Sequence, residues 1–134
     1  SRLGFVDVMT GRTYIRYLDF SFLFAIWIRT LNRQLRESKV ANRRLQSWEK
    51  SVTIELKQVG SFAFRLRKGR FERLKKPPKK PDVVFSTDIL TYTQIVREGV
   101  FDWKGSLKTK KLTLHGEPAD IEMLKRILRW MWGD

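Results

Sequence analysis

The chain has 134 residues, a net charge of +14 at pH 7 and 42% hydrophobic residues. That length fits one domain, residues 1–134, with one sizeable apolar core. Without cysteine the chain cannot form a disulfide, a thiol nucleophile or a Cys-ligated metal site, and its single histidine, His115, excludes a multi-histidine site. We therefore expect no metal and no cofactor.

The positive charge is concentrated in the first 80 residues. Residues 1–51 carry ten Lys/Arg and four acids, residues 52–80 carry ten and two, and residues 81–134 carry eight of each. Such a surplus attracts phospholipid head groups, nucleic acid or an acidic protein. No apolar run approaches the roughly 20 residues of a membrane-spanning helix, and no signal-peptide pattern is visible. The sequence therefore predicts a cytoplasmic protein.

Residues 13 to about 47 are expected to be helical, because apolar side chains recur there at steps of three and four. The main stripe consists of Tyr17, Phe20, Phe24, Trp27, Leu31 and Leu35. A second stripe, Ile15, Leu18, Phe22 and Ala25, predicts that the first half of the helix is buried on several sides. Beyond Arg29 the pattern narrows and becomes basic, and a break near Ser38 would give two helices. The position of that break stays open.

From Val52 the apolar pattern changes to a period of two, which predicts half-buried strands. Two strands are expected around residues 52–57 and 62–67, joined by Gly60-Ser61, and Lys68-Gly69 leads into a third strand at residues 70–74. Short links that contain glycine are typical of antiparallel hairpins. The sequence therefore predicts an antiparallel meander.

The segment from Lys75 to Pro81 cannot lie inside a sheet, because its three prolines lack donors and its four lysines repel one another. We expect an exposed, stiff connector that leads into a fourth strand from Pro81 to Ser86. Thr87 or Asp88 then caps a short helix that ends at Gly99.

The last third of the chain starts with an ambiguous segment, residues 100–109, which fits either a short helix or a loop. Alternation returns from Lys111 to Gly116 and predicts a fifth strand. Pro118 opens a final helix with apolar residues on one side. The predicted class is α+β, with an N-terminal helical segment (residues 1–51) before an α+β core (residues 52–132).

Two local motifs carry a family resemblance. Residues 81–88 (PDVVFSTD) match a valine-rich strand that follows a Pro-Asp pair and leads through a polar cap into a helix. Residues 110–117 (KKLTLHGE) are similar to a Gly-Lys-Leu-x-Ile-x-Gly-Asp strand, with Lys110 for the glycine and Glu117 for the final aspartate. With the order of elements from Val52 onward, these motifs resemble the sterol carrier protein type 2 (SCP-2) family over about residues 52–132.

The resemblance implies a five-stranded, mainly antiparallel sheet covered by helices, with a hydrophobic tunnel for fatty acyl chains, sterols or other lipids. It brings no catalytic residues. We place the ligand contacts on inward-facing apolar positions, namely Phe62, Phe64, Phe85, Ile95, Leu112, Leu114, Ile121, Leu124 and Leu128. The alternative for each is plain core packing. Phe64 and Leu124 are expected to be nearly buried and to face one another between sheet and helix.

Exposed cations are the second candidate site. Contacts with anionic surfaces are predicted for Arg65, Arg67, Lys75, Lys76, Lys79 and Lys80, which suit peripheral binding to an anionic membrane. Nucleic acid is the main rival partner for this charge. The sheet lacks the aromatic octamer of RNA-recognition domains, since Ser61 follows Gly60 and Phe62 stands where a small residue belongs. Specific nucleic-acid binding is therefore disfavoured.

Two further classes were weighed. His115, Glu117 and Asp120 do not form a Ser-His-Asp order or a spaced carboxylate pair, so no enzyme is predicted. The first helix either lies at the centre of the core or forms a homo-oligomer through apolar residues that point in several directions, namely Phe20, Phe22, Phe24, Ile26 and Trp27. The sequence thus indicates a non-catalytic carrier of an apolar ligand. The alternative is a basic nucleic-acid-binding or oligomeric module without a lipid.

Overall fold

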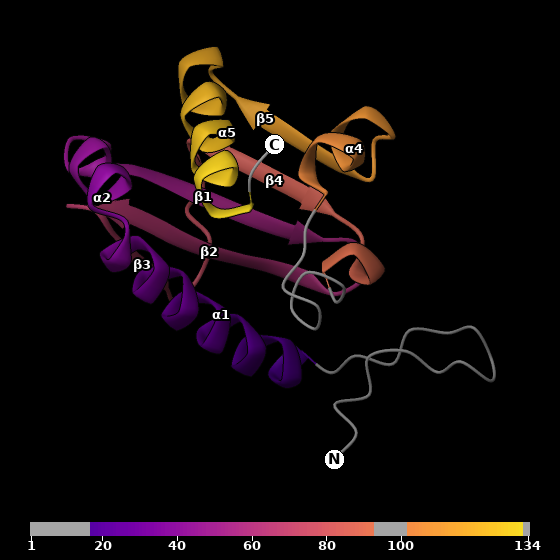
Figure 1. The fold of residues 1–134 in the computed structure, drawn as a ribbon. Helices are drawn as coiled ribbons and strands as arrows, with labels where there is room; N and C mark the ends of the chain where they lie inside the picture. Colours follow the sequence, from indigo (N-terminus) through magenta and orange to yellow (C-terminus); the bar gives the residue numbers. More distant parts are fainter. Residues whose placement is uncertain (1–16, 93–101, 133–134) are drawn as a thin grey trace.

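The computed structural model describes residues 17–92 and 102–132, which contain one five-stranded sheet in the order β3-β2-β1-β4-β5 (Figure 1). Its strands are β1 (Lys50–Leu56), β2 (Gly60–Arg67), β3 (Arg70–Leu74), β4 (Val83–Thr87) and β5 (Leu112–Gly116). β1 and β4 pair in parallel, and the other three neighbouring pairs are antiparallel. The predicted α+β class and mainly antiparallel sheet are confirmed.

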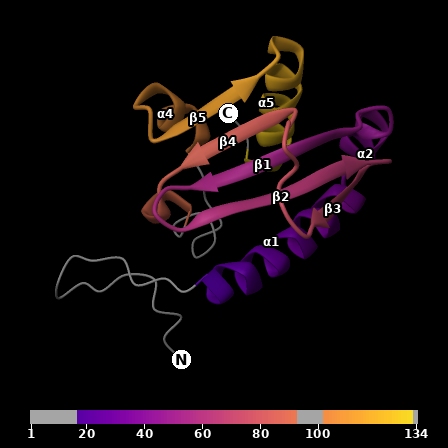
Figure 2. The same ribbon diagram turned by 180° about the vertical axis from the view of Figure 1, so that it is seen from behind.

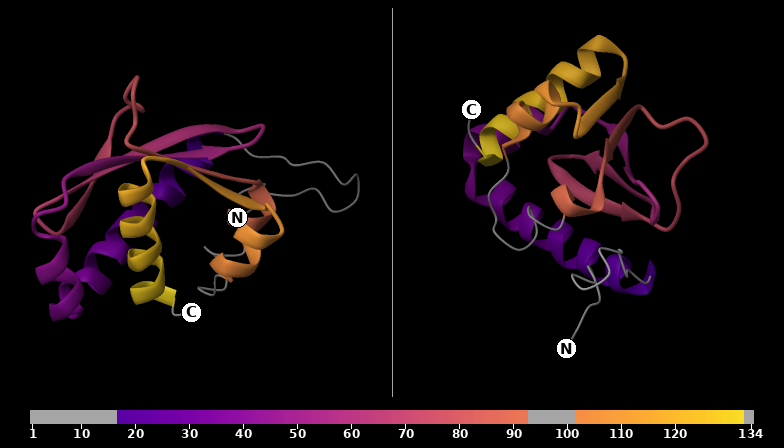
Figure 3. Two further views of the ribbon diagram at one scale, coloured as in Figure 1. Left: turned by 90° about the horizontal axis from the view of Figure 1, so that it is seen from above. Right: turned by 90° about the vertical axis from the view of Figure 1, so that its right-hand side faces the viewer.

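The helices lie together on one side of this sheet (Figure 3). They are α1 (Tyr17–Glu37), α2 (Lys39–Leu45), α4 (Trp103–Lys108) and α5 (Pro118–Trp132), with a further helical stretch at residues 89–92. A sheet covered on one face needs apolar side chains on alternate residues only. The period of two read from the sequence reflects this arrangement.

The break in the first helical segment lies at Ser38. Its backbone is extended (φ −98°, ψ 96°), and its hydroxyl accepts a hydrogen bond from the Ala41 amide at 3.3 Å. Such an N-cap satisfies one of the donors that a helix start leaves free. The chain therefore forms two helices, α1 and α2. The predicted helical residues before Tyr17 lie outside the described part of the chain.

Aspartates start two of the short helical segments. Asp88 Oδ1 accepts a hydrogen bond from Thr91 N at 2.7 Å, so Asp88 is the cap of the segment after β4. Asp102 Oδ1 accepts one from Gly105 N at 3.0 Å and begins α4. The segment that the sequence left ambiguous is therefore helical from Trp103 to Lys108. The predicted end of the preceding helix, Gly99, lies outside the described residues.

The two predicted hairpins form, one of them with a different turn. Lys68 (φ 52°) and Gly69 (φ 73°) make a two-residue turn with both residues in the left-handed region, as in a type I′ hairpin. Between β1 and β2 the turn is formed by residues 57–59, and Gln58 takes the left-handed conformation (φ 69°). The sequence prediction that Gly60-Ser61 makes this turn was wrong, because both residues belong to β2.

The core forms between the inner face of the sheet and the helices. Alternate residues of β1 and β2 point inward and are buried, namely Val52, Ile54, Leu56, Phe62, Phe64 and Leu66. One line of α1 packs on them through Phe24, Ile28, Leu31 and Leu35. Spacings of three and four keep that line on one side of the helix. Helix α1 is thus part of the core.

Directional contacts fix α1 to the edge strand β3. The Asn32 side chain donates to the Phe71 carbonyl oxygen (2.8 Å) and accepts from the Phe71 amide (2.7 Å). An edge strand has backbone amide and carbonyl groups that no neighbouring strand bonds, and the Asn32 side chain is the hydrogen-bond partner of both such groups at Phe71. The Arg73 guanidinium also donates to the carbonyl oxygen of Ser21 (2.9 Å) and to its hydroxyl. Both contacts set where α1 lies on the sheet.

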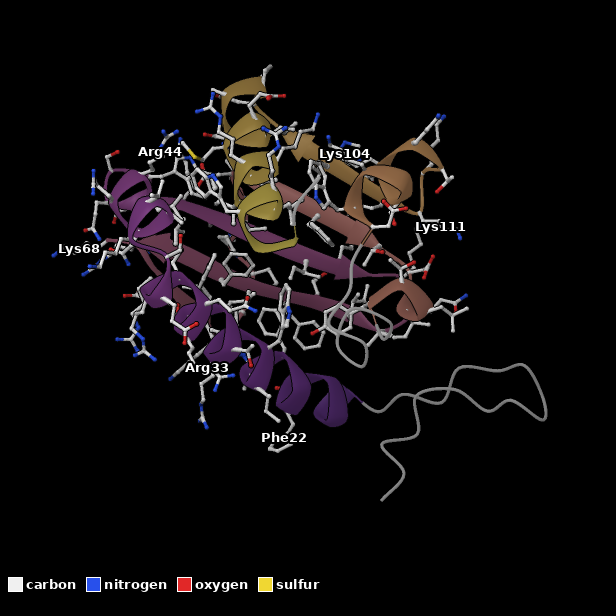
Figure 4. All side chains as sticks on the ribbon, viewed as in Figure 1. Phe22, Arg33, Arg44, Lys68, Lys104 and Lys111 are labelled. Atoms are coloured by element: carbon white, nitrogen blue, oxygen red, sulfur yellow. The ribbon has the colours of Figure 1, made fainter. Side chains whose placement is uncertain are left out.

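Two large apolar side chains are exposed on the opposite side of α1. Phe22 is 61% exposed and Ile26 is 45% exposed. Figure 4 shows Phe22 and Arg33 on the side of α1 that faces away from the sheet. The prediction that the first half of this helix is buried on several sides was therefore wrong for these residues, because one sheet covers one side only. Ile15 and the side chain of Leu18 lie outside the described part.

The connection between β3 and β4 crosses the outer face of the sheet. β3 is an edge strand and β4 pairs with β1, so the chain must pass β2 and β1 (Figure 2). Thr53 and Ala63 are buried on this face, and the prolines of the connection are half-buried. Asp82 anchors its end by accepting hydrogen bonds from Ser51 N (2.8 Å) and Ser51 Oγ (3.2 Å). The predicted connector therefore also covers the sheet.

Replacing Asn32 tests whether it fixes α1 to the sheet. Asn32→Ala leaves the amide and carbonyl of Phe71 without their side-chain partner, which should lower the free energy of unfolding by about 1–3 kcal/mol. Gln34→Ala, an exposed position on the same helix, is the matched control and should change it by about 0.5 kcal/mol or less. Urea unfolding followed by circular dichroism measures both. Equal stability of the two variants would contradict the role of Asn32.

Candidate ligand cavity

An apolar cavity lies between the sheet and helices α1 and α5. Its walls are Trp27, Leu31, Val52, Ile54, Phe64, Phe71, Phe85, Leu124, Ile127 and Leu128. None of these side chains is charged, and the indole of Trp27 is the only one with a polar atom. The cavity volume is about 30 Å³. Since a water molecule needs roughly 10–15 Å³ of such space, side chains nearly fill the cavity.

Three layers of the fold supply the walls. The sheet contributes its central strands β1, β2 and β4 together with Phe71 of β3. From α1 come Trp27 and Leu31, one turn apart, and from α5 come three residues at spacings of three and one. These spacings place each set on one side of its helix. The cavity therefore lies where two apolar helix faces meet the same part of the sheet.

The α1 side of the cavity is aromatic. The Phe24 ring lies 5.3 Å from Phe62, 5.9 Å from Trp27 and 6.4 Å from Phe64, measured between ring centroids. Phe64 and Phe71 pack edge to face at 5.1 Å. Such pairs contribute about 0.5–1.5 kcal/mol beyond their buried area. This cluster holds α1 against the sheet and forms one wall of the cavity.

A tyrosine and an arginine border this cluster. Trp27 packs edge to face on Tyr92 at 5.9 Å, and the Arg73 guanidinium lies 5.5 Å from the centre of the Phe24 ring. Burial raises the pKa of Tyr92 above its usual range, and the positive charge of Arg73 acts in the opposite direction. Tyr92 is therefore a neutral phenol at physiological pH, and Arg73 is the cation beside the aromatic wall.

The residues predicted as ligand contacts fall into three groups. Phe64, Phe85, Leu124 and Leu128 line the cavity. Phe62 and Leu112 are buried in the same core but do not line it, and Leu114 and Ile121 are half-buried. Ile95 lies outside the described residues. As expected, Phe64 and Leu124 are nearly buried (5% and 4% exposed), and both border the same space.

Six wall residues were not among the predicted contacts, namely Trp27, Leu31, Val52, Ile54, Phe71 and Ile127. Each has an apolar side chain on an inward-facing stripe of its helix or strand. What the sequence does not show is which inward positions of different elements meet. For α1 this depends on the Asn32 contact with Phe71, 39 residues further along the chain.

The predicted cationic residues gather on the other side of the sheet from the cavity. Arg65 and Arg67 are exposed on the outer face. Lys75, Lys76, Lys79 and Lys80 are exposed on the connection between β3 and β4, and Figure 2 shows the path of this connection across the outer face. We call these six residues the outer basic surface. Glu72 is the cross-strand neighbour of Arg65. The sheet therefore separates the outer basic surface from the apolar cavity.

The remaining features of the described residues concern the histidine, one ion pair, and candidates for a metal site or a membrane span. His115 is exposed on β5, and Asp120 forms an ion pair with Lys50 at 3.4 Å that links the start of α5 to β1. Among residues 17–92 and 102–132, no three His, Asp or Glu side chains are placed to hold a metal ion. None of the helices in this part of the chain is both long and apolar enough to cross a membrane.

Comparison with solved structures shows what the fold is similar to. A protein titled "UbiJ-SCP2 Ubiquinone synthesis protein" is 16% identical, with a TM-score of 0.59 over 80% of this chain and 93% of that one. The solution structure of sterol carrier protein domain 2 of Helicoverpa armigera is 10% identical, with a TM-score of 0.57 over 81% and 87%. At such identities the likeness shows the fold alone.

A part of an enzyme has the same fold. The sec-alkylsulfatase Pisa1 from Pseudomonas sp. is 16% identical, with a TM-score of 0.52 over 68% of this chain. The match spans only 14% of the sulfatase, so nothing about its reaction transfers to this chain. No curated protein sequence matches the chain.

The family itself is established by sequence. The model of the SCP-2 sterol transfer family matches residues 28–129, from the middle of α1 to the last turns of α5. The match starts well before residue 52, where the resemblance read from the sequence began, so it includes α2 and the C-terminal half of α1. Together with the sheet order and the apolar cavity, this match shows that the chain belongs to the SCP-2 sterol transfer family.

Proposed function

We propose that the protein is a non-catalytic carrier that holds an apolar ligand, such as a fatty acyl chain, a sterol or another lipid, between the sheet and helices α1 and α5. Membership in the SCP-2 sterol transfer family supports lipid binding as the general role. The observation that carries the finer proposal is the cavity, whose ten wall residues include no charged side chain. An apolar wall of this kind stabilises an apolar ligand by removing its surface from water.

Binding requires the cavity to open. Pockets for drug-sized ligands have volumes of roughly 300–1,000 Å³, whereas this one has about 30 Å³. Asn32 and Arg73 fix α1 through hydrogen bonds. For α5 the ion pair of Asp120 lies in the first turn, and Leu124, Ile127 and Leu128 follow it along the helix. Apolar packing is non-directional and re-forms around a ligand, so we propose that the later turns of α5 move outward.

Filling the cavity tests the proposal. Leu124→Trp adds volume at a buried wall position, so it should abolish binding of a fluorescent fatty acid and lower the free energy of unfolding by about 1–3 kcal/mol. Arg126→Trp places the same side chain on an exposed position of α5 and should leave both quantities nearly unchanged. Fluorescence titration and urea unfolding on the same preparations measure them.

Two outcomes of this titration would contradict the carrier. If the Leu124→Trp variant binds the fatty acid with the same affinity as the parent protein, the ligand lies elsewhere. A parent protein that binds no lipid would favour the alternative of an interaction module. The observation that favours that module is the exposure of Phe22 (61%) and Ile26 (45%) on α1.

We further propose that the outer basic surface binds anionic membranes. Arg65, Arg67 and the four lysines suit this role because each Lys or Arg close to an anionic bilayer surface contributes about 1 kcal/mol to membrane binding. The sheet lies between them and the cavity, so membrane binding and ligand binding should be separable in this protein. Cytoplasmic residence stays a prediction of the sequence.

Charge reversal tests the membrane contact. Replacing Lys75, Lys76, Lys79 and Lys80 by Glu should weaken binding to phosphatidylglycerol vesicles at least tenfold, while fatty-acid affinity and melting temperature change little because these side chains are exposed. The control reverses Lys104, Lys108, Lys110 and Lys111, four exposed lysines away from the outer face. Vesicle sedimentation at low and high salt measures the binding. Equal loss in both variants would show that net charge alone acts.

A further inference from the structure

We propose that Arg73 binds the anionic head group of the ligand, so that the carrier prefers amphiphiles with a carboxylate or phosphate head over neutral lipids of the same chain length. This inference rests on the proposed carrier function and narrows its ligand class. Three features of Arg73 support it: the face of the sheet from which it projects, its distance from the cavity wall, and the absence of a carboxylate ion-pair partner among the described residues.

Arg73 lies on the cavity face of the sheet. It pairs with Phe64 in the β2–β3 register, and it is two residues from Phe71 on the same strand. Phe64 and Phe71 both line the cavity, and residues two apart on a strand share a face. The neighbours Arg70 and Glu72 are on the outer face. Arg73 is therefore the one cation of β3 on the side where the ligand would bind.

A single aromatic ring separates this cation from the cavity. The guanidinium carbon lies 5.5 Å from the centre of the Phe24 ring. The same ring lies 5.9 Å from Trp27 and 6.4 Å from Phe64, which are cavity walls. Arg73 itself is exposed to solvent. A chain that leaves the cavity past Phe24 would thus bring its head group to the guanidinium at the protein surface.

The surroundings of Arg73 suit an anion. Its hydrogen bonds go to the carbonyl and hydroxyl oxygens of Ser21, which are neutral acceptors. Within the part of the chain that the structure describes, no carboxylate forms an ion pair with it. Arg73 also borders a surface hollow of about 370 Å³. Ser21 holds the guanidinium in one orientation, and a planar fork of donors matches the oxygens of a carboxylate or phosphate.

The test compares ligands that share one chain and differ in the head. Isothermal titration calorimetry measures the affinity for oleate, for oleoyl lysophosphatidate and for the neutral oleyl alcohol. We expect the parent to bind at least one of the anions more tightly than the alcohol. Arg73→Gln should weaken binding of that anion roughly three- to tenfold and leave oleyl alcohol unchanged, because the lost interaction is a partly solvated charge-assisted hydrogen bond.

Arg70→Gln is the matched control, since it removes the same charge from an exposed position on the outer face of the same strand. It should leave all three affinities unchanged. The anion that loses affinity in Arg73→Gln identifies whether the carboxylate or the phosphate is the head group bound. Unfolding curves of both variants record any loss of the Ser21 contact.

Several results would overturn the proposal. If Arg73→Gln binds the anions with the same affinity as the parent, Arg73 does not bind the head group. If the variant loses the same affinity for the anions and for the alcohol, Arg73 acts only through the position of α1. In these cases the carrier function would stand. A parent protein that binds none of the three ligands would overturn the carrier function and this inference together.

Discussion

The parallel pairing of β4 with β1 is the constraint on which the rest of the structure depends. Because β4 lies next to β1, the chain that leaves the edge strand β3 must cross the sheet, and it does so on the face without helices. The other face is then left to α1, α4 and α5. One topological choice thus places the cations of the connection on one side and the apolar cavity on the other. The proposed contact with a membrane and the proposed contact with a ligand therefore involve different faces of the sheet.

The two helices that border the cavity are held in different ways. α1 is held by hydrogen bonds from Asn32 and Arg73, which have a fixed geometry and fail when the helix shifts. α5 is tied to β1 in its first turn by the Asp120–Lys50 ion pair, and its cavity-lining residues pack through apolar contacts. Apolar contacts tolerate re-arrangement because their strength follows buried area and not direction. The proposed opening therefore combines one wall that is fixed by directional contacts with one wall that is held by apolar packing.

Much of this fold could be predicted from local patterns, because each strand and helix buries one face. The meander to Leu74, the fifth strand and the helix that starts at Pro118 agree with the alternation and caps in the sequence. Other features depend on contacts between distant residues. Nothing near Asn32 indicates that it binds Phe71, and nothing near Phe22 indicates that its side chain is largely exposed. The same holds for the cavity walls. The sequence pattern shows which residues of each element face inward, but it does not show which inward-facing residues of different elements come into contact.

The size of the cavity also limits how a ligand can be bound. In the proposed outward movement of α5, the apolar surfaces of its wall residues would lose contacts with the sheet, at a cost of about 25 cal/mol per Å² exposed to water. A ligand chain offsets this cost only by covering the same surfaces, so chain length contributes to affinity up to the area that α5 uncovers. A head group held outside the apolar space adds affinity without requiring further opening. A cation one ring away from the wall is therefore where selectivity among ligands with similar chains can arise, and Arg73 is at that position.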